Sequence, residues 1–221
     1  SQALDSIKKS LRRHRPRLFS KQDLNQLFAK NKKKWNLPVA MSSKKFINAL
    51  MQESVIDYCH FDSNAGALER YYLCRSSSYY IVLNLIPRTF LSHASALNIW
   101  GMTAENPTLY INHELSPASV KSGKGKLTQS AIDSVFIRPQ RQPALSTKFR
   151  GLDVVLTHGK FSNQLGVIEV TLKDSEKIMV TNLERTLIDC VVRPGYALPT
   201  EEMIKIFRQA QGSISVAKLA D

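Results

Sequence analysis

One stretch near the end of this 221-residue chain specifies local structure more tightly than any other. Residues 177–181 have the composition of a β-strand, and a helical pattern follows that stops before Pro194. Thr181 and Glu184 have the spacing of a capping box, which predicts where that helix begins. The residues expected on its apolar face are Leu183, Leu187, Ile188 and Val191. A strand that runs directly into a capped helix indicates an α/β domain.

The rest of residues 76–221 fits a mixed α/β domain. Further strands are predicted at residues 79–85, 108–112, 134–137, 152–157 and 165–172. Ser92 is the expected N-cap of a helix that ends at Gly101. Thr200 is the expected cap of a later helix, and its predicted buried residues are Met203, Ile204 and Phe207. A last helix is predicted from Ser215, and we expect this domain to continue beyond Asp221.

Positive charge is concentrated at the N-terminal end. The whole chain carries 31 Lys and Arg against 18 Asp and Glu, a formal net charge of +13. Residues 1–50 contain 13 of the basic residues and only two acids, Asp5 and Asp23. Such clustering favours binding to a polyanion, because cations must converge on one surface to displace counterions from phosphates. A general solubility charge is the alternative explanation.

The first 75 residues show three amphipathic helices followed by a β-hairpin. The first helix carries Ile7 and Leu11 on its apolar face, and the second is capped by Ser20. The third begins near Ser42 or Ser43, and the hairpin strands cover residues 55–61 and 70–74. This order predicts a winged helix-turn-helix over residues 1–75. The expected fold class is therefore α+β, with that module followed by a mixed α/β domain over residues 76–221.

Residues 42–53 would be the recognition helix, with Phe46, Ile47, Leu50 and Met51 turned inward. The residues left for base or nearby phosphate contacts are Ser43, Lys44, Lys45, Asn48 and Gln52. The candidates for phosphate contacts are Arg12, Arg13, Arg15, Arg17, Lys21 and Arg70. Asp62 and Glu69 in the wing would repel phosphates. Contact with another protein is the alternative use of this module.

Other chemistries have weaker support. Residues 116–130 form a Gly- and Lys-containing segment that predicts a mobile basic loop, but its spacing does not match a phosphate-binding loop. The three cysteines, Cys59, Cys74 and Cys190, lack metal-ligand spacing and suit a reducing cytoplasm. No apolar run approaches the length of a membrane span. We therefore expect a cytoplasmic protein with no membrane partner, no metal and no cofactor.

A nuclease is the main enzymatic alternative. Asp153 and Glu169 fall on predicted strands that could be neighbours, and two such carboxylates can hold Mg²⁺ and activate water. Sites of this kind usually present Glu-x-Lys, whereas Thr171 occupies the lysine position here. An active or inactivated metal-dependent nuclease, guided to DNA by the winged helix, remains open on the sequence alone.

Two segments resemble the sequence blocks of one family, the AbiEi-type antitoxins. Residues 91–103 are LSHASALNIWGMT, and residues 180–189 are VTNLERTLID. The order and spacing of these blocks, and the helical N-terminal start, also resemble that family. Most residues in the blocks have structural explanations: a buried hydrogen bond for His93, and an ion pair between Arg185 and Asp189.

The resemblance implies an antitoxin of a type IV toxin–antitoxin pair, associated with abortive infection and phage defence. It implies that the winged helix binds repeats in the operon's own promoter and represses transcription. It further implies that residues 76–221 counter a nucleotidyltransferase-like toxin without requiring a stable complex. The resemblance thus implies a binding protein and transcription regulator, not an enzyme.

Overall fold

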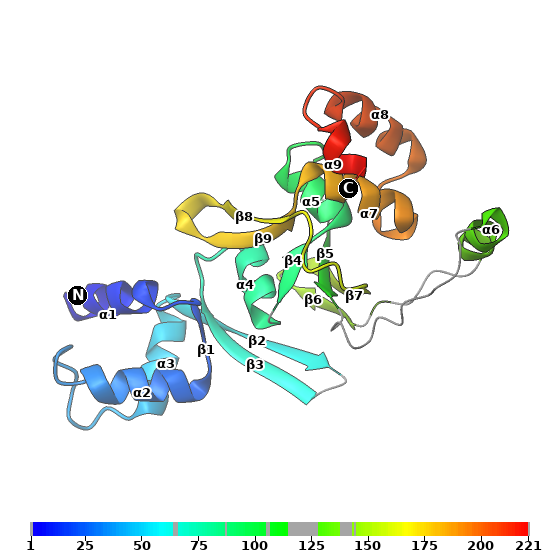
Figure 1. Ribbon diagram of the computed structural model, residues 1–221. Coiled ribbons are helices and arrows are strands. Elements are labelled where there is room, and N and C mark those ends of the chain that lie inside the picture. Colours follow the sequence, from blue (N-terminus) through cyan, green and yellow to red (C-terminus); the bar gives the residue numbers. More distant parts are fainter. Residues whose placement is uncertain are drawn as a thin grey trace. The chain divides into compact units, whose positions relative to one another are not determined.

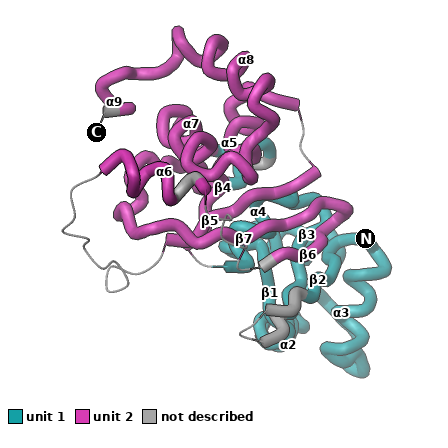
Figure 2. The backbone as a smooth tube through the Cα atoms, turned by 90° about the vertical axis from the view of Figure 1, so that its right-hand side faces the viewer, with its two compact units in different colours: residues 1–87, 171–176 teal, residues 88–170, 177–221 magenta. Residues whose placement is uncertain are grey.

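The computed structural model describes residues 2–63, 66–86, 88–104, 107–114, 128–137, 143 and 145–220. Over these residues the protein is a mixed α+β fold with two β-sheets (Figure 1). It divides into two compact units, each made of two separate stretches of the chain (Figure 2). The N-terminal unit comprises residues 1–87 and 171–176, and the C-terminal unit comprises residues 88–170 and 177–221. Residues 76–87, which we assigned to the second domain from the sequence, cluster with the N-terminal unit.

The N-terminal unit combines helices with a three-stranded antiparallel sheet of order β1-β3-β2. Its elements are α1 (Gln2–Arg13), β1 (Leu18–Phe19), α2 (Lys21–Asn31), α3 (Ser43–Gln52), β2 (Ile56–Ser63), β3 (Gly66–Leu73), α4 (Ser78–Leu85) and the 3-10 helix η2 (Lys173–Ser175). The expected hairpin is confirmed by the pairing of β2 with β3 from Ile56↔Leu73 to Ser63↔Gly66. The two-residue strand β1 was not predicted, because it is too short to show an alternating pattern.

Side chains from α1, α2, α3 and the sheet form one core. Its largest fully buried members include Trp35, Phe19, Phe46, Leu24 and Leu11. Trp35 is buried although α2 ends at Asn31, four residues earlier. The cap predicted at Ser20 is confirmed, and the third helix begins at Ser43, as expected. Ser20 and Asp23 form a capping box at α2, and the Ser42 side chain accepts from the Lys45 backbone N–H at α3.

Residues 79–85 are helical, so the strand predicted there is wrong. The Ser77 side chain caps α4 by accepting from the Tyr80 N–H. Five of the helix's eight residues are buried: Tyr80, Ile81, Val82, Leu83 and Leu85. A helix buried on most sides has a nearly continuous apolar sequence, which periodicity alone does not distinguish from a buried strand.

The C-terminal unit is built on a mixed six-stranded sheet of order β6-β7-β5-β4-β9-β8. Its strands are β4 (Thr89–Leu91), β5 (Thr108–Glu114), β6 (Leu145–Phe149), β7 (Leu152–Gly159), β8 (Val167–Thr171) and β9 (Lys177–Thr181). Its helices are α5 (His93–Ile99), α6 (Gln129–Ile137), α7 (Leu183–Val192), the 3-10 helix η3 (Pro194–Tyr196), α8 (Thr200–Ala210) and α9 (Val216–Ala220). Strand β5 runs parallel to β7, and β4 runs parallel to β9.

The strand predicted at residues 134–137 is also wrong, because those residues complete α6. Thr128 caps this helix through its Oγ1, which accepts from the Ala131 N–H, and Gln129 donates to Asp133 one turn later. These local bonds outweigh the short apolar run that suggested a strand. Helix α6 also takes in the last two residues of the loop predicted at 116–130. Residues 116–127 of that loop lie outside the described residues.

The cap predicted for α7 is displaced by one residue. Asn182, not Thr181, is the N-cap, and its side chain accepts from the Arg185 N–H. Thr181 remains the last residue of β9, where its hydroxyl bonds that of Thr186. Glu184 does not complete a capping box; its carboxylate accepts from the Ser215 N–H instead. Asparagine is as good a cap as threonine, so the sequence offered two adjacent candidates.

The buried faces predicted for α7 and α8 are only partly right. Leu183, Leu187 and Cys190 are buried on α7, whereas Ile188 and Val191 are exposed. On α8 the buried residues are Met203, Ile206 and Ala210, whereas Ile204 and Phe207 are exposed. The predicted cap of α8 is also wrong, because Pro199 takes the N-cap position and Thr200 is the first helical residue.

Candidate nucleic-acid interface

Helix α3 presents a polar face to solvent. The exposed residues of this face are Lys44, Lys45, Asn48 and Gln52. Asn48 is three or four residues from each of the others, so the four side chains lie on one side of the helix. On the opposite side Phe46, Ile47 and Leu50 are buried in the core of the N-terminal unit. The packing of those three residues fixes which side of α3 faces outward. The helix therefore offers two lysines, an amide and a second amide from one rigid surface.

Ser43, the fifth residue predicted for base contacts, has a structural partner. Its hydroxyl donates to the Asn25 side-chain oxygen and so ties the first turn of α3 to α2. This bond positions α3 relative to the helix before it. Ser43 is half-buried, in contrast to the lysines that follow it.

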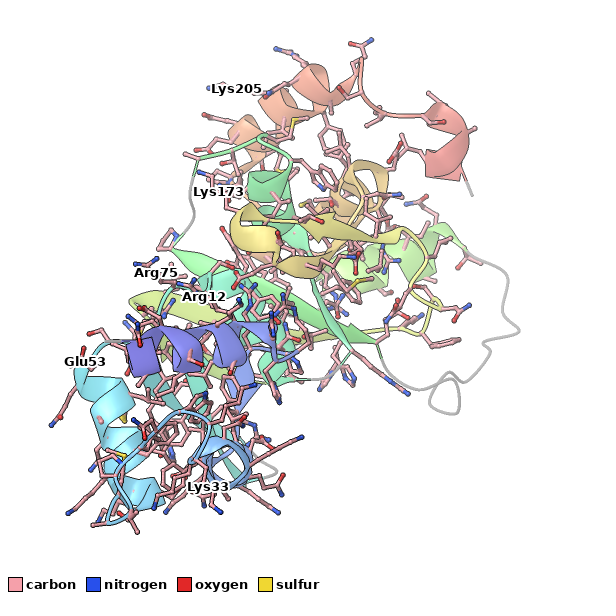
Figure 3. All side chains as sticks on the ribbon, turned by 90° about the vertical axis from the view of Figure 1, so that its left-hand side faces the viewer. Arg12, Lys33, Glu53, Arg75, Lys173 and Lys205 are labelled. Atoms are coloured by element: carbon pink, nitrogen blue, oxygen red, sulfur yellow. The ribbon has the colours of Figure 1, made fainter. Side chains whose placement is uncertain are left out.

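The Lys30–Lys34 cluster divides into two roles. The Lys32 ammonium donates to the backbone oxygens of Val39 and Met41 and lies 5.2 Å from the centre of the Phe28 ring. It therefore holds the segment between α2 and α3 in place. Lys30, Lys33 and Lys34 are exposed, and Figure 3 labels Lys33 close to α2. Only these three are available to a polyanion.

The predicted phosphate contacts from residues 12–17 do not share one environment. Arg12, Arg13 and Arg15 are exposed, and Arg15 donates to the backbone oxygens of Arg12 and His14. Arg17 is largely buried and forms an ion pair with Glu176 across 3.2 Å. Arg12 and Arg17 instead line hollows that both include Arg75. Neither hollow is lined by a residue of α3.

The described charged side chains of the β2–β3 hairpin are Asp57, Glu69 and Arg70, so its net charge there is −1. Lys21 is exposed, and Arg70 is half-buried and donates to the backbone oxygen of Glu69. The Glu69 carboxylate lies 3.5 Å from His60, and its hydrogen bond with Tyr58 lowers its pKa and raises that of Tyr58 to about 12. The negative charge of Glu69 offsets Arg70 where the wing would meet DNA.

In the C-terminal unit the residues of the two sequence blocks form one buried network. Leu91 of β4 pairs with Val180 of β9, and α5 packs against α7. The predicted ion pair is confirmed: Arg185 Nε lies 2.9 Å from Asp189 Oδ1, and the same guanidinium donates to the Leu165 backbone oxygen. Glu114 lies 4.0 Å from Arg185 on its other side. Burial raises the pKa of Asp189 despite the opposing effect of Arg185.

Gly166, which directly precedes β8, lies so close to Arg185 that only glycine fits there. Its φ is +69°, and a Cβ there would lie 2.8 Å from Arg185 Cβ. Any other side chain would push the arginine away from its partners. The network around Arg185 therefore has the features of a packed scaffold, consistent with the structural roles expected of these residues.

His93 is buried, as expected, and its Nδ1 lies 2.7 Å from the Ser92 hydroxyl. The ring packs edge-on against Tyr196. Burial, and to a smaller extent the positive charges of Arg193 and Arg185, lower its pKa to about 3. A neutral imidazole with no path to solvent suits packing better than proton transfer.

The carboxylates of the nuclease alternative do not meet. Asp153 lies on β7 and Glu169 on β8, and three strands separate β7 from β8 in the sheet. Asp153 instead lies 3.7 Å from Lys148, and Glu169 lies 2.6 Å from Lys177. The expectation that these strands are neighbours is wrong. Across the described residues, no group of three or more His, Cys, Asp or Glu side chains is arranged to hold a metal ion.

Within the described part of the chain, no helix has both the length and the apolar character needed to cross a membrane. No family model matches this chain, and no curated protein matches it either.

Proposed function

We propose that this protein is a DNA-binding autorepressor and antitoxin of a type IV toxin–antitoxin operon. In this proposal the N-terminal unit is a winged helix-turn-helix that binds double-stranded DNA at repeats in its own promoter. The C-terminal unit counters a nucleotidyltransferase-like toxin without a stable complex being required.

The DNA-binding half rests on one observation, the exposed polar face of α3. Lysine and asparagine on one helix face can contact guanine, adenine and phosphate in a major groove about 12 Å wide. The element order α1-β1-α2-α3-β2-β3 and the sheet order β1-β3-β2 support a helix-turn-helix with a hairpin wing. Lys44 and Lys45 also have no carboxylate within 4.0 Å among the described residues.

The antitoxin half rests on the resemblance of residues 91–103 and 180–189 to the blocks of that family. These segments lie side by side in the C-terminal unit, through the β4–β9 pairing and the packing of α5 on α7. The two segments are distant in sequence but adjacent in the structure, which supports a resemblance that extends over the domain.

The double variant Lys44→Ala/Lys45→Ala tests both halves. It should weaken binding to the protein's own promoter about 100-fold in fluorescence anisotropy, because each specific contact is worth roughly 1–3 kcal/mol. The same variant should still protect cells that co-express the neighbouring toxin, because its C-terminal unit is intact. The matched control, Lys205→Ala/Arg208→Ala on α8, removes the same charge from exposed positions of the other unit.

Equal loss of affinity in both double variants would mean that overall charge, not α3, drives binding. Loss of toxin protection together with full retention of promoter binding in the α3 variant would reverse the proposed division of labour.

A further inference from the structure

Two adjoining hollows in the N-terminal unit form what we call the basic groove. The first has a volume of about 340 Å³ and is lined by Lys8, Arg12, Glu53, Ser54, Val55, Leu73 and Arg75. The second, of about 230 Å³, shares Arg12, Leu73 and Arg75 and adds Arg17 and Ser76. The lining therefore comes from α1, from the turn that follows α3, and from the residues after β3. Figure 3 labels Arg12, Glu53 and Arg75 around this region.

The groove has an excess of positive charge. Four cationic side chains line it, against one carboxylate, that of Glu53. Arg17 is neutralised by Glu176. Among the described residues, no carboxylate lies within 4.0 Å of the charged nitrogens of Lys8, Arg12 or Arg75. Three uncompensated cations around a concave surface focus a positive potential on the space between them.

The floor of the groove is apolar and held in place by the backbone. Val55 and Leu73 are each 7% exposed. The Val55 N–H donates to the Leu50 oxygen, the Cys74 N–H donates to Val55, and the Ser76 N–H donates to Leu73. A preformed apolar floor with a few charged groups at its walls is typical of small-molecule sites, whose volumes begin at roughly 300 Å³.

The groove lies at the C-terminal end of α3, away from the two lysines that begin the polar face of that helix. Glu53 follows the last residue of α3, whereas Lys44 lies in its first turn. At about 1.5 Å per residue, roughly 13 Å of helix separates these two positions. DNA docked on α3 therefore leaves this groove without an assigned ligand.

We propose that the basic groove binds a small organic diphosphate, of which a nucleoside diphosphate is the simplest example. Lys8 and Arg12 are four residues apart on α1, so their charges lie on one side of the groove, and Arg75 supplies a third from the β3 side. With the Glu53 carboxylate in the lining, the three cations leave a net positive charge, opposite in sign to the roughly three negative charges of a diphosphate at neutral pH. The small exposed parts of Val55 and Leu73 line the space that the organic part would occupy.

Isothermal titration of the full chain at low salt tests this proposal, with ADP as the probe and AMP and adenosine for comparison. We expect saturable one-to-one binding of ADP, weaker binding of AMP and none of adenosine. Arg12→Gln/Arg75→Gln should weaken ADP binding at least about tenfold, because it removes two of the three cations that would bond the phosphates. Glu53→Gln should tighten it about threefold, because it removes the only lining carboxylate. Lys205→Gln/Arg208→Gln, an equal charge change on α8, should leave it unaltered.

Three results would overturn the proposal: no saturable ADP binding, equal weakening by the α8 control, or an unchanged affinity in Glu53→Gln. Binding of duplex DNA that depends on Arg12 and Arg75, without any binding of ADP, would also overturn it. If Arg12→Gln/Arg75→Gln does not fold by circular dichroism, Lys8→Gln replaces it, with an expected loss of about threefold. The α3 variant Lys44→Ala/Lys45→Ala should bind ADP normally, so failure of the DNA proposal is separable from failure of this one.

Discussion

His93 illustrates how a single buried side chain can link stability to pH. The ring is enclosed in the C-terminal unit, has a positive φ of 53° and hydrogen-bonds to Ser92. Burial first, then Arg193 and Arg185, lower its pKa from 6.5 to about 3. The folded protein therefore keeps this imidazole neutral at pH values where the unfolded chain would protonate it.

We expect this residue to contribute stability that is complete above pH 6.5 and lost progressively as pH falls toward 3. Because the unfolded chain binds the extra proton, the slope attributable to His93 reaches at most about 1.4 kcal/mol per pH unit. His93→Gln should remove that slope. Urea unfolding of both proteins at several pH values between 3.5 and 7.5 measures it. Parallel stability curves would show that His93 is not the group responsible.

At the scale of elements, α8 shows how a correct helix can be assigned the wrong buried face. Met203, Ile204 and Phe207 fit a helical spacing, and so do Met203, Ile206 and Ala210. The structure buries the second set against Leu97 of α5 and Leu187 of α7. Helices α7 and α8 consequently leave Ile188, Val191, Ile204 and Phe207 exposed.

Ile206→Ala should lower the free energy of unfolding by about 2–4 kcal/mol, because the side chain is 4% exposed and its removal leaves a cavity. Phe207→Ala on the next position removes a larger side chain that is 38% exposed and should cost less than about 1 kcal/mol. Guanidinium unfolding followed by circular dichroism compares the two. A greater loss from Phe207→Ala would mean that the other face of α8 is packed.

At the scale of the whole molecule, a late segment of the chain completes the N-terminal unit. Glu176, 2% exposed, pairs with Arg17 and accepts a bond from the Ser77 N–H that precedes α4. A basic segment read as DNA-binding therefore includes one arginine with a structural role. Residues 1–87 alone would lack this carboxylate and leave a largely buried guanidinium without its counter-charge.

Glu176→Gln should destabilise the protein by about 3 kcal/mol, because it leaves the Arg17 charge uncompensated in a buried position. Glu169→Gln breaks the pair with Lys177, in which both side chains are at least half exposed, and should cost less than about 1 kcal/mol. Chemical denaturation of the two variants provides the comparison. Similar losses of stability in the two variants would show that burial of the Arg17–Glu176 pair does not increase its contribution to the free energy of unfolding.

The amino-acid sequence by itself determined the features that depend on near neighbours. The cap at Ser20, the start of α3 near Ser42 or Ser43, the hairpin, the Arg185–Asp189 pair and the amphipathic character of α3 all follow from residues a few positions apart. Their interactions are fixed once the local backbone forms. The tertiary structure alone decided what depends on distant segments: whether residues 79–85 form a strand or a helix, which face of α8 is buried, and how far apart Asp153 and Glu169 lie. It also brought Arg12, Arg75 and Glu53 around one groove and gave Arg17 its partner 159 residues away. These outcomes depend on burial and strand order, which arise only when the chain packs.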